Sequence, residues 1–459
     1  MKSWASGWGL KLFRSLVFAS LALCVAAAHS ESPPKATLGL LEAWRLALDN
    51  DPTLRAAGAG ARAGRERLPQ AQSQLLPNIA ASAAISSNHV NRDALDVIGQ
   101  TVSDRNTYLS KNETLVLRQP IFRQPQWVGM RQARYQVEDA EAMFEREFQN
   151  LAVRVASAYF DLMQARDQVQ LLDSQSEFLQ SRLTAASRAI TSGTGTRTDL
   201  DDAQARFDLN RAQRLEAIQA IQARRRRLQA IVNRPIGDLP SLDPGRLNLD
   251  PPTRGTPEAW VLLAIDGSPE MRSARARLEA ATEEVRRTQA GHLPSVDAIA
   301  QWQRSRNEVI TQPRTGYTNA SIGIQVNLPL YGGGYTESTV REARALQVRF
   351  SELLEATKLD LGMRVHTEYN AITEGIDRIK ALEVAARSAD VALDSARKSV
   401  LAGVRSSLDV LNAQQQRMQV LSALAGARYG LLLARVRLLS LVGQIDESSF
   451  APISESLRP

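Results

Sequence analysis

The two halves of the chain carry the same short motifs in the same order. The shared motifs are EAW (42–44 and 258–260), a leucine–proline pair (ending at Pro77 and Pro294), RQPIF with NLPLY (118–122 and 327–331), and a glycine six residues before an aspartate (Gly193 with Asp199, Gly403 with Asp409). Each motif recurs after about 210 residues, which indicates a tandem repeat of one supersecondary unit. Any fold for this chain must therefore contain the same elements twice.

The repeats predict the domain organisation. Repeat 1 is assigned to 37–234 and repeat 2 to 258–445. The segment between them, 235–257, is rich in proline and glycine and is interpreted as a linker. The last residues, 446–459, are expected to form a short frayed tail without an assigned role.

The N-terminus has the pattern of a secretory signal peptide. Basic residues precede an apolar run at 16–28 that ends in three alanines, so 1–28 is predicted to be removed by cleavage after Ala28. The chain's one cysteine, Cys24, lies in this segment, and Leu23 before it argues against lipid attachment. Cleavage lowers the net charge from +7 to 7 − 3 = +4. For an exported, cysteine-free chain, we expect neither disulfides nor nucleic-acid binding.

Each repeat begins with a predicted helix followed by two predicted strands. The first helix is expected at 38–75, ending before Pro77 because proline disfavours helix in the residue before it. The expected strands are about 78–90 and 107–121 in repeat 1 and about 295–304 and 316–330 in repeat 2, with exposed outer loops at 91–106 and 304–316. Apolar and polar residues alternate in the last strand, which predicts one apolar and one polar face.

Very long helices are predicted after the strands. One seam steps alternately by three and four residues and is apolar or alanine at every position except Ser176: Phe148, Leu151, Val155, Ala158, Leu162, Ala165, Val169, Leu172, Ser176, Leu179, Leu183, Ala186 and Ile190. A second seam comprises Ile379, Leu382, Ala386, Ala389, Leu393, Ala396 and Val400. Such seams indicate coiled coils, and six heptads form a rod on the order of 65 Å long.

Half-apolar strands flanked by rods leave no globular domain to cover the apolar face. A transmembrane β-barrel would cover it with lipid, because lipid-facing and lumen-facing residues alternate in such barrels. An open four-stranded sheet cannot span a membrane, since its edge backbone groups would be unpaired in lipid. The chain is therefore expected to oligomerise, with eight strands from two copies or twelve from three. The sequence pattern alone leaves both numbers open, and either assembly would be a conduit.

The order of these motifs resembles the TolC family of outer-membrane efflux and type I secretion channels. The resemblance runs from Thr37 to Ile445 and includes NDP at 50–52, LPLYGGG at 328–334 and the stretch GVRSSLDVLNA at 403–413. It implies a mainly α fold with β structure. In a homotrimer, four strands per chain would build a 12-stranded transmembrane barrel continuous with a 12-helix coiled-coil periplasmic tunnel. It also implies location in the outer membrane of a Gram-negative-type cell.

The resemblance further implies a passive exit duct. Its partners would be a periplasmic adaptor (membrane fusion) protein and an inner-membrane ABC or proton-driven transporter, because the chain has no nucleotide site of its own. The adaptor is expected to dock on the tips at Ser192, Gly193, Gly403 and Ser406. No enzyme activity, cofactor or metal is expected. The cargo is left open between drugs, peptides, proteins and metals, and the LPLYGGG turn and the missing lipid-attachment cysteine favour the type I secretion branch.

The residues expected to control passage also come from the resemblance. The positions that match the family's periplasmic aperture and gate are Asp199, Asp409, Asn412, Arg405 and Thr198, and Asp202 lies one turn beyond Asp199. The family's paired acids fall on Asp409 and Asn412, so one acid is missing, and Asp202 is a candidate replacement. Symmetry would copy each carboxylate into a ring that attracts cations in a narrow pore.

The gate is expected to depend on an arginine. The family's gating tyrosine falls on Val400, which cannot hydrogen-bond, so closure is expected to rest on Arg405 bonding Thr198 or Asp199. The alternative is that Asp199 and Asp409 serve as helix N-caps, a common use of aspartate, and the two roles are compatible.

One other function class is kept as an alternative to the channel. A periplasmic coiled-coil adaptor or scaffold without a barrel would also be exported and rich in heptads. It is expected to show a single helical hairpin, whereas this sequence has two helix–strand–strand–helix repeats. A hydrolase ranks third, because no nucleophile–base pair or carboxylate pair occurs at informative spacing.

Overall fold

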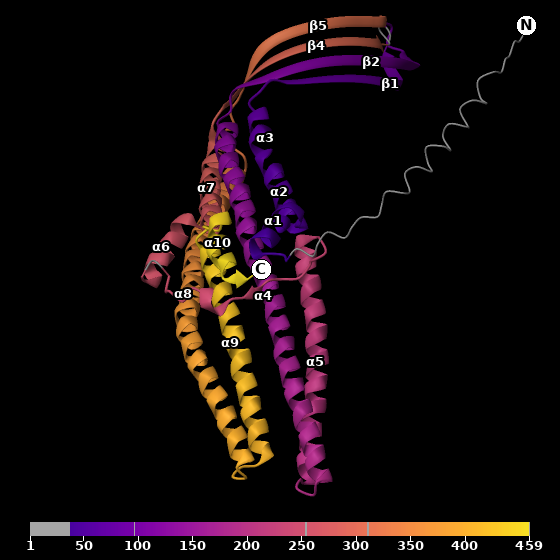
Figure 1. Cartoon of the computed structure of the whole chain (residues 1–459). Coiled ribbons are helices and arrows are strands. Elements are labelled where there is room, and N and C mark those ends of the chain that lie inside the picture. The colour runs from indigo at the N-terminus through magenta and orange to yellow at the C-terminus, as the bar shows by residue number, and fades with distance from the viewer. Residues whose placement is uncertain (1–36, 96, 253–254, 310–311, 459) are drawn as a thin grey trace, which may run out of the picture.

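The computed structural model describes residues 37–95, 97–252, 255–309 and 312–458 (Figure 1). The predicted signal peptide at 1–28 lies outside these residues. Repeat 1 contains α1 (Leu40–Asn50), α2 (Pro52–Arg65), α3 (Arg67–Ser73), β1 (Asn78–Leu95), β2 (Thr101–Phe122), α4 (Gln124–Thr191) and α5 (Arg197–Val232). Repeat 2 contains α6 (Pro257–Gly267), α7 (Pro269–Gln289), β4 (Ser295–Val309), β5 (Gln312–Asn327), α8 (Tyr335–Leu401) and α9 (Ser407–Leu441). The mainly α fold with one four-stranded sheet agrees with the prediction.

The four long strands form one antiparallel sheet in the order β1-β2-β4-β5. The pairing of β2 with β4 joins the two repeats and places Leu117 opposite Ala300. In Figure 1 the sheet arches away from one end of the helices. The sheet is open in this chain, with β1 and β5 at its edges.

The prediction of outer loops at 91–106 and 304–316 is wrong, because the strands continue through most of these ranges. The ladder of β1 and β2 continues to Leu95 opposite Thr101, and β4 and β5 extend to Val309 and Gln312. These strand ends are polar, which is why the sequence suggested loops. Polar residues nevertheless pair well across strands: Arg92 lies opposite Asp104, and unlike charges in that position stabilise a hairpin.

The two faces of the sheet differ in polarity, as the alternation predicted. One face, named the apolar face here, carries Ile79, Leu115, Leu117, Ala300, Trp302, Ile322, Ile324 and Val326. The opposite face carries Ser82, Asn88, Ser110, Asn112, Thr114, Gln301, Gln303, Ser305, Ser321 and Gln325. On the polar face, Ser305 Oγ donates to Asn112 Oδ1 at 2.6 Å. On the apolar face, Ile322 and Ile324 are 87% and 70% exposed in the single chain, so this face requires an apolar covering.

The predicted coiled-coil helices are longer than their seams. The helix α4 has 68 residues and α8 has 67, which corresponds to about 100 Å each. Both repeats pack their long helices as antiparallel pairs, α4 with α5 and α8 with α9 (Figure 1). The glycine run after β5 makes the turn into α8, where Gly333 and Gly334 have φ of 62° and 83° that other residues rarely adopt. Among the described residues, none of the helices combines the length and apolarity needed to cross a bilayer.

The single helix expected at 38–75 is wrong, because this segment forms three helices. The first break lies at Asp51, which is extended (φ −66°, ψ 120°), and its carboxylate accepts the backbone N–H of Leu54 at 2.8 Å to cap α2. Pro52 explains the break, since proline disfavours helical geometry in the preceding residue. The second break is the single residue Glu66 between α2 and α3, whose backbone stays in the right-handed helical region (φ −66°, ψ −15°).

The frayed tail expected at 446–459 is also wrong. Residues Glu447–Glu455 form α10, and Leu457–Arg458 form β6, which pairs with β3 (Ser241–Leu242) in the segment between the repeats. Phe450 is 1% exposed and stacks on Trp44 of α1 with ring centroids 5.0 Å apart. The tail therefore belongs to the main core, which lies midway along the long helices where α1 and α10 meet (Figure 1).

Candidate functional site

The tips of the two long helix pairs have the same backbone geometry. Each pair turns through a glycine in the left-handed region, Gly193 at φ 77° and Gly403 at φ 74°. Each of these glycines follows a residue whose N–H closes the last helical turn, Ser192 onto Arg188 and Ala402 onto Lys398, both at 3.0 Å. The expected docking residues Ser192, Gly193, Gly403 and Ser406 are all exposed. The two tips thus share one backbone geometry, as a repeat requires, while their side chains differ: Gly195 of the first tip corresponds to Arg405 of the second.

The predicted aperture acids lie in the first turn of each tip helix but are not its N-caps. Thr196 caps α5 and accepts the N–H of Asp199 at 3.2 Å, while its hydroxyl donates to that carboxylate at 2.6 Å. Ser406 caps α9 in a capping box with Asp409, whose carboxylate accepts the Ser406 N–H at 3.1 Å. The alternative in which Asp199 and Asp409 are themselves the N-caps is therefore wrong. Both acids nevertheless stabilise the cap, because each lies three residues after the N-cap and bonds back to it.

Two polar contacts join the tip helices α5 and α9, and so join the repeats. Ser407 Oγ donates to Asp199 Oδ1. Two turns further along, Arg206 donates to Asn412 Oδ1 at 3.1 Å and also pairs with Asp202 at 3.2 Å. The hydrogen bond from Ser407, together with that from Thr196, holds the pKa of Asp199 below its ordinary value.

The expected bond from Arg405 to Thr198 or Asp199 is not formed within the chain. Among the described residues, the exposed side chains of Arg405 and Thr198 have no hydrogen bond or ion pair. The carboxylate of Asp199 is instead occupied by Thr196 and Ser407. Arg405 is therefore free to reach a neighbouring chain.

Sequence reasoning missed Ser407 and Arg206, the two donors that link α5 to α9. Arg206 had a signal, because it lies four residues after Asp202, the spacing at which helix side chains pair. Its second contact, with Asn412, joins residues 206 positions apart and has no local signal. Ser407 lacked a signal as well, since its contact with Asp199 spans 208 positions.

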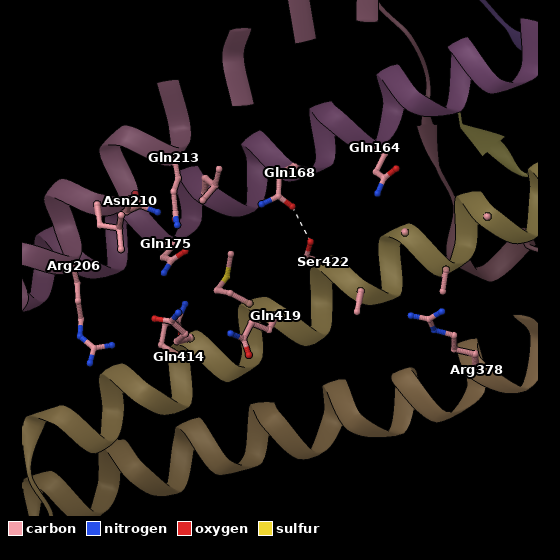
Figure 2. Close-up of a pocket in the computed structure, with 18 of the residues that line it drawn as sticks. Gln164, Gln168, Gln175, Arg206, Asn210, Gln213, Arg378, Gln414, Gln419 and Ser422 are labelled. Carbon is pink, nitrogen blue, oxygen red and sulfur yellow. Dashed lines mark hydrogen bonds between the residues drawn. The ribbon is translucent and has the colours of Figure 1, made fainter. Parts of the chain in front are cut away.

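A cavity of about 930 Å³, lined by both polar and apolar side chains, lies between the two helix pairs above the tips. Figure 2 shows side chains extending into it from both pairs, including Gln164, Gln168, Gln175, Gln213, Gln414 and Gln419. Ser422 donates to Gln168 across it at 2.9 Å. Asn210 is 1% exposed, and within the described part of the chain neither the Oδ1 nor the Nδ2 atom of its amide has a hydrogen-bond partner. In this stretch the helix pairs therefore face each other across amide groups as well as leucine side chains such as Leu172 and Leu209.

A charged cluster fastens the sheet to the helices at the other end. Asp297 of β4 is 2% exposed and accepts from Arg118 of β2 and from Arg123, which precedes α4, both at 2.6 Å. Nearby, Gln119 donates to the backbone oxygen of Leu75 at 3.0 Å. These contacts fix the direction in which the long helix leaves the sheet.

The comparisons with known proteins agree with this architecture. The family model described as outer membrane efflux protein matches residues 43–234 and 260–444. The chain is 32% identical to the alkaline protease secretion protein AprF of Pseudomonas aeruginosa, over 90% of this chain and 85% of that protein. It is 28% identical to the proteases secretion protein PrtF of Dickeya chrysanthemi, over 91% and 90%.

Solved structures show the same fold at lower sequence identity. The outer membrane protein VceC of Vibrio cholerae superposes with a TM-score of 0.74 at 20% identity, over 88% of this chain and 96% of that one. The open-state outer membrane channel MtrE of Neisseria gonorrhoeae gives 0.73 at 20% identity, over 88% and 89%. The family model and the relatives AprF and PrtF support the channel and not the alternative of an adaptor without a barrel.

Proposed function

The chain belongs to the outer membrane efflux protein family, and we propose that three copies of it form the exit duct of a protein secretion system. As in the family, the chain is an outer-membrane channel with a helical tunnel in the periplasm. Our proposal concerns four properties of this channel: its number of copies, its partners, its gate and its cargo.

The single observation that carries the proposal is the open sheet with one exposed apolar face. Lipid covers that face, but lipid cannot satisfy the backbone groups at the edges β1 and β5. Three copies close twelve strands into a barrel in which each β1 pairs with a neighbouring β5. The same symmetry closes α4, α5, α8 and α9 of each chain into a tunnel of twelve helices.

The duct works passively, and its energy comes from an inner-membrane transporter through a periplasmic adaptor. The adaptor docks on the tip turns at Ser192, Gly193, Gly403 and Ser406. All four residues are exposed, and Gly193 and Gly403 occupy the same position in the two repeats. Helical hairpins dock most readily on coiled coils, with charged residues at the rim setting the register.

The gate is formed by Asp199, Asp202, Asp409, Asn412, Arg405 and Thr198 at the tip. Within each chain, the contacts of Asp199 with Ser407 and of Asn412 with Arg206 hold α5 against α9. Arg405, which is free in the chain, closes the gate by pairing with a neighbouring chain. Asp202 and Asp409 add to the acidic ring.

Proteins are the proposed cargo. The support is that AprF and PrtF, whose names describe protease secretion, align with nearly the whole chain. Expression in a Pseudomonas aeruginosa strain lacking AprF tests the assignment. We expect export of alkaline protease to be restored, with unchanged resistance to small toxic compounds. Restored resistance without protease export would show a small-molecule efflux duct.

Adaptor docking is tested by cross-linking. A cysteine placed at Ser192 or Ser406 is expected to capture the adaptor's hairpin in cells, because these tip positions are exposed. The matched control is a cysteine at Ser241, in the segment between the repeats that is also exposed. Capture at Ser241 alone would contradict docking at the tips.

A further inference from the structure

The apolar face of the sheet changes abruptly to charged residues toward the hairpin ends. In the row beyond Trp302, Glu113 lies opposite Arg304. In the next row, Lys111 lies opposite Arg306. Because side chains alternate along a strand, these four residues project from the same face as the apolar residues below them. The face is therefore amphiphilic, and these two rows together hold three cations and one anion.

The cations form no ion pair among the residues that the structure describes. Lys111 and Arg306 are directly opposite each other on neighbouring strands, an arrangement that destabilises a sheet unless an anion lies between them. Lys111, Arg304 and Arg306 are exposed, and among the described residues none of the three forms an ion pair. Glu113 offsets one charge, so the cluster has a net charge of 3 − 1 = +2.

An apolar groove lies directly beside this cluster on the same face. It has a volume of about 410 Å³, and its lining includes Leu115, Trp302 and Ile322. Trp302 is in the row next to Arg304. A molecule that fills the groove and neutralises the cations needs a hydrocarbon chain and an anionic headgroup.

The cluster lies at the depth of lipid headgroups. From Val296, at the helix end of the apolar face, to Arg306 is about ten residues, or about 33 Å of strand. With the tilt of about 45° found in membrane barrels, this length spans about 23 Å, close to the height of the apolar band of such barrels. Arg306 therefore reaches the rim of the band farthest from the helices, which is the outer leaflet.

We propose that Lys111, Arg304 and Arg306 bind the phosphate groups of the outer leaflet's phosphorylated glycolipid, with an acyl chain of that lipid in the adjacent groove. The inference rests on the proposed function, in which the apolar face is the lipid-facing side of the barrel. Two guanidinium groups and one ammonium group suit a phosphate, since arginine binds it with paired hydrogen bonds.

The test compares lipid binding by the purified channel in phosphatidylcholine nanodiscs with and without bisphosphorylated lipid A. Native mass spectrometry counts the lipid A molecules retained per channel. We expect the triple variant K111Q/R304Q/R306Q to bind lipid A about tenfold or more weakly than the parent, because each cation near a charged membrane surface contributes to binding. Adding inorganic pyrophosphate to the discs without lipid A is expected to leave no bound phosphate, since a free anion cannot use the groove.

Matched variants separate the site from general charge and folding effects. The control K380Q/R188Q/R387Q removes one lysine and two arginines from exposed helix positions and is expected to bind lipid A like the parent. The charge-conserving variant K111R/R304K/R306K is expected to retain binding if the three positions act as cations. Equal binding by the parent and K111Q/R304Q/R306Q, or equal loss in the helix control, would overturn the proposal. Bilayer conductance of K111Q/R304Q/R306Q tests the channel separately, and it should equal that of the parent whichever way the lipid result falls.

Discussion

At the scale of single residues, two hydrogen-bonded contacts connect the repeats at the tips, Ser407 with Asp199 and Arg206 with Asn412. Both contacts join distant parts of the sequence. Resemblance to the family identified Asp199 and Asn412 but not their donors, because a family motif marks positions and does not reveal which side chains meet. Asp199 and Asn412 are therefore structural links within the chain as well as candidate residues of the gate.

Replacing Ser407 with alanine is expected to loosen the closed tip. Removing this bond to a charged but partly exposed group costs about 1 kcal/mol, which corresponds to about a fivefold rise in the open population. Single-channel conductance in planar bilayers measures the change, and S406A, which alters the cap and not the link between repeats, is the control.

The same contact predicts a pH dependence. Because hydrogen bonding lowers the pKa of Asp199, the ionised form is favoured in the linked state. The link is therefore fully formed above the ordinary aspartate pKa of about 4 and is lost as pH falls through the lowered value. The parent should become more conductive on acidification below that range, and S407A should show a smaller change. Equal conductance of parent and S407A at every pH would show that the contact does not hold the tip.

Arg405 is predicted to act between chains. It is exposed and forms no ion pair with any residue that the structure describes, so R405S should not alter the stability of the single chain. The R405S substitution is expected to raise single-channel conductance, because each of the three chains loses the cationic link from its α8–α9 tip to a neighbouring chain. R188S, at an exposed arginine of α4, provides the control. Unchanged conductance in R405S would remove Arg405 from the gate.

At the scale of elements, the sequence was most informative where periodicity is strict and sustained. The heptad seams predicted α4 and α8, and the alternation predicted the two faces of the sheet. The errors have physical causes. The polar strand ends resembled loops because sequence patterns detect apolar faces, whereas backbone pairing continues without them. The tail appeared frayed because its partners, Trp44 and β3, are about 200 or more residues distant.

The C-terminal helix α10 is expected to be needed for stability. Phe450 is almost fully buried against Trp44, and removing a buried phenylalanine ring typically costs 3–5 kcal/mol, about the upper end for one substitution. F450A should therefore lower the thermal unfolding temperature of the purified channel. E455A changes an exposed residue of the same helix and should leave that temperature unchanged. If F450A unfolds at the parent's temperature, α10 is not part of the core in the assembled protein.

At the scale of the whole molecule, the single chain is incomplete in two places. Its sheet has open edges and an uncovered apolar face, and a cavity of about 930 Å³ lies between its long helix pairs. Both features are consistent with a wall segment of a larger tube whose neighbours complete it. The small aromatic share of 5% fits the same architecture, because a wall one helix thick has no deep core to fill.

The central claim is that three copies close into one barrel and one tunnel. Native mass spectrometry of the complex extracted from outer membranes tests it most directly. We expect the mass of three mature chains, because three copies supply the twelve strands and twelve helices that close the barrel and the tunnel. A complex of two chains, or a single chain stable in the membrane, would contradict it.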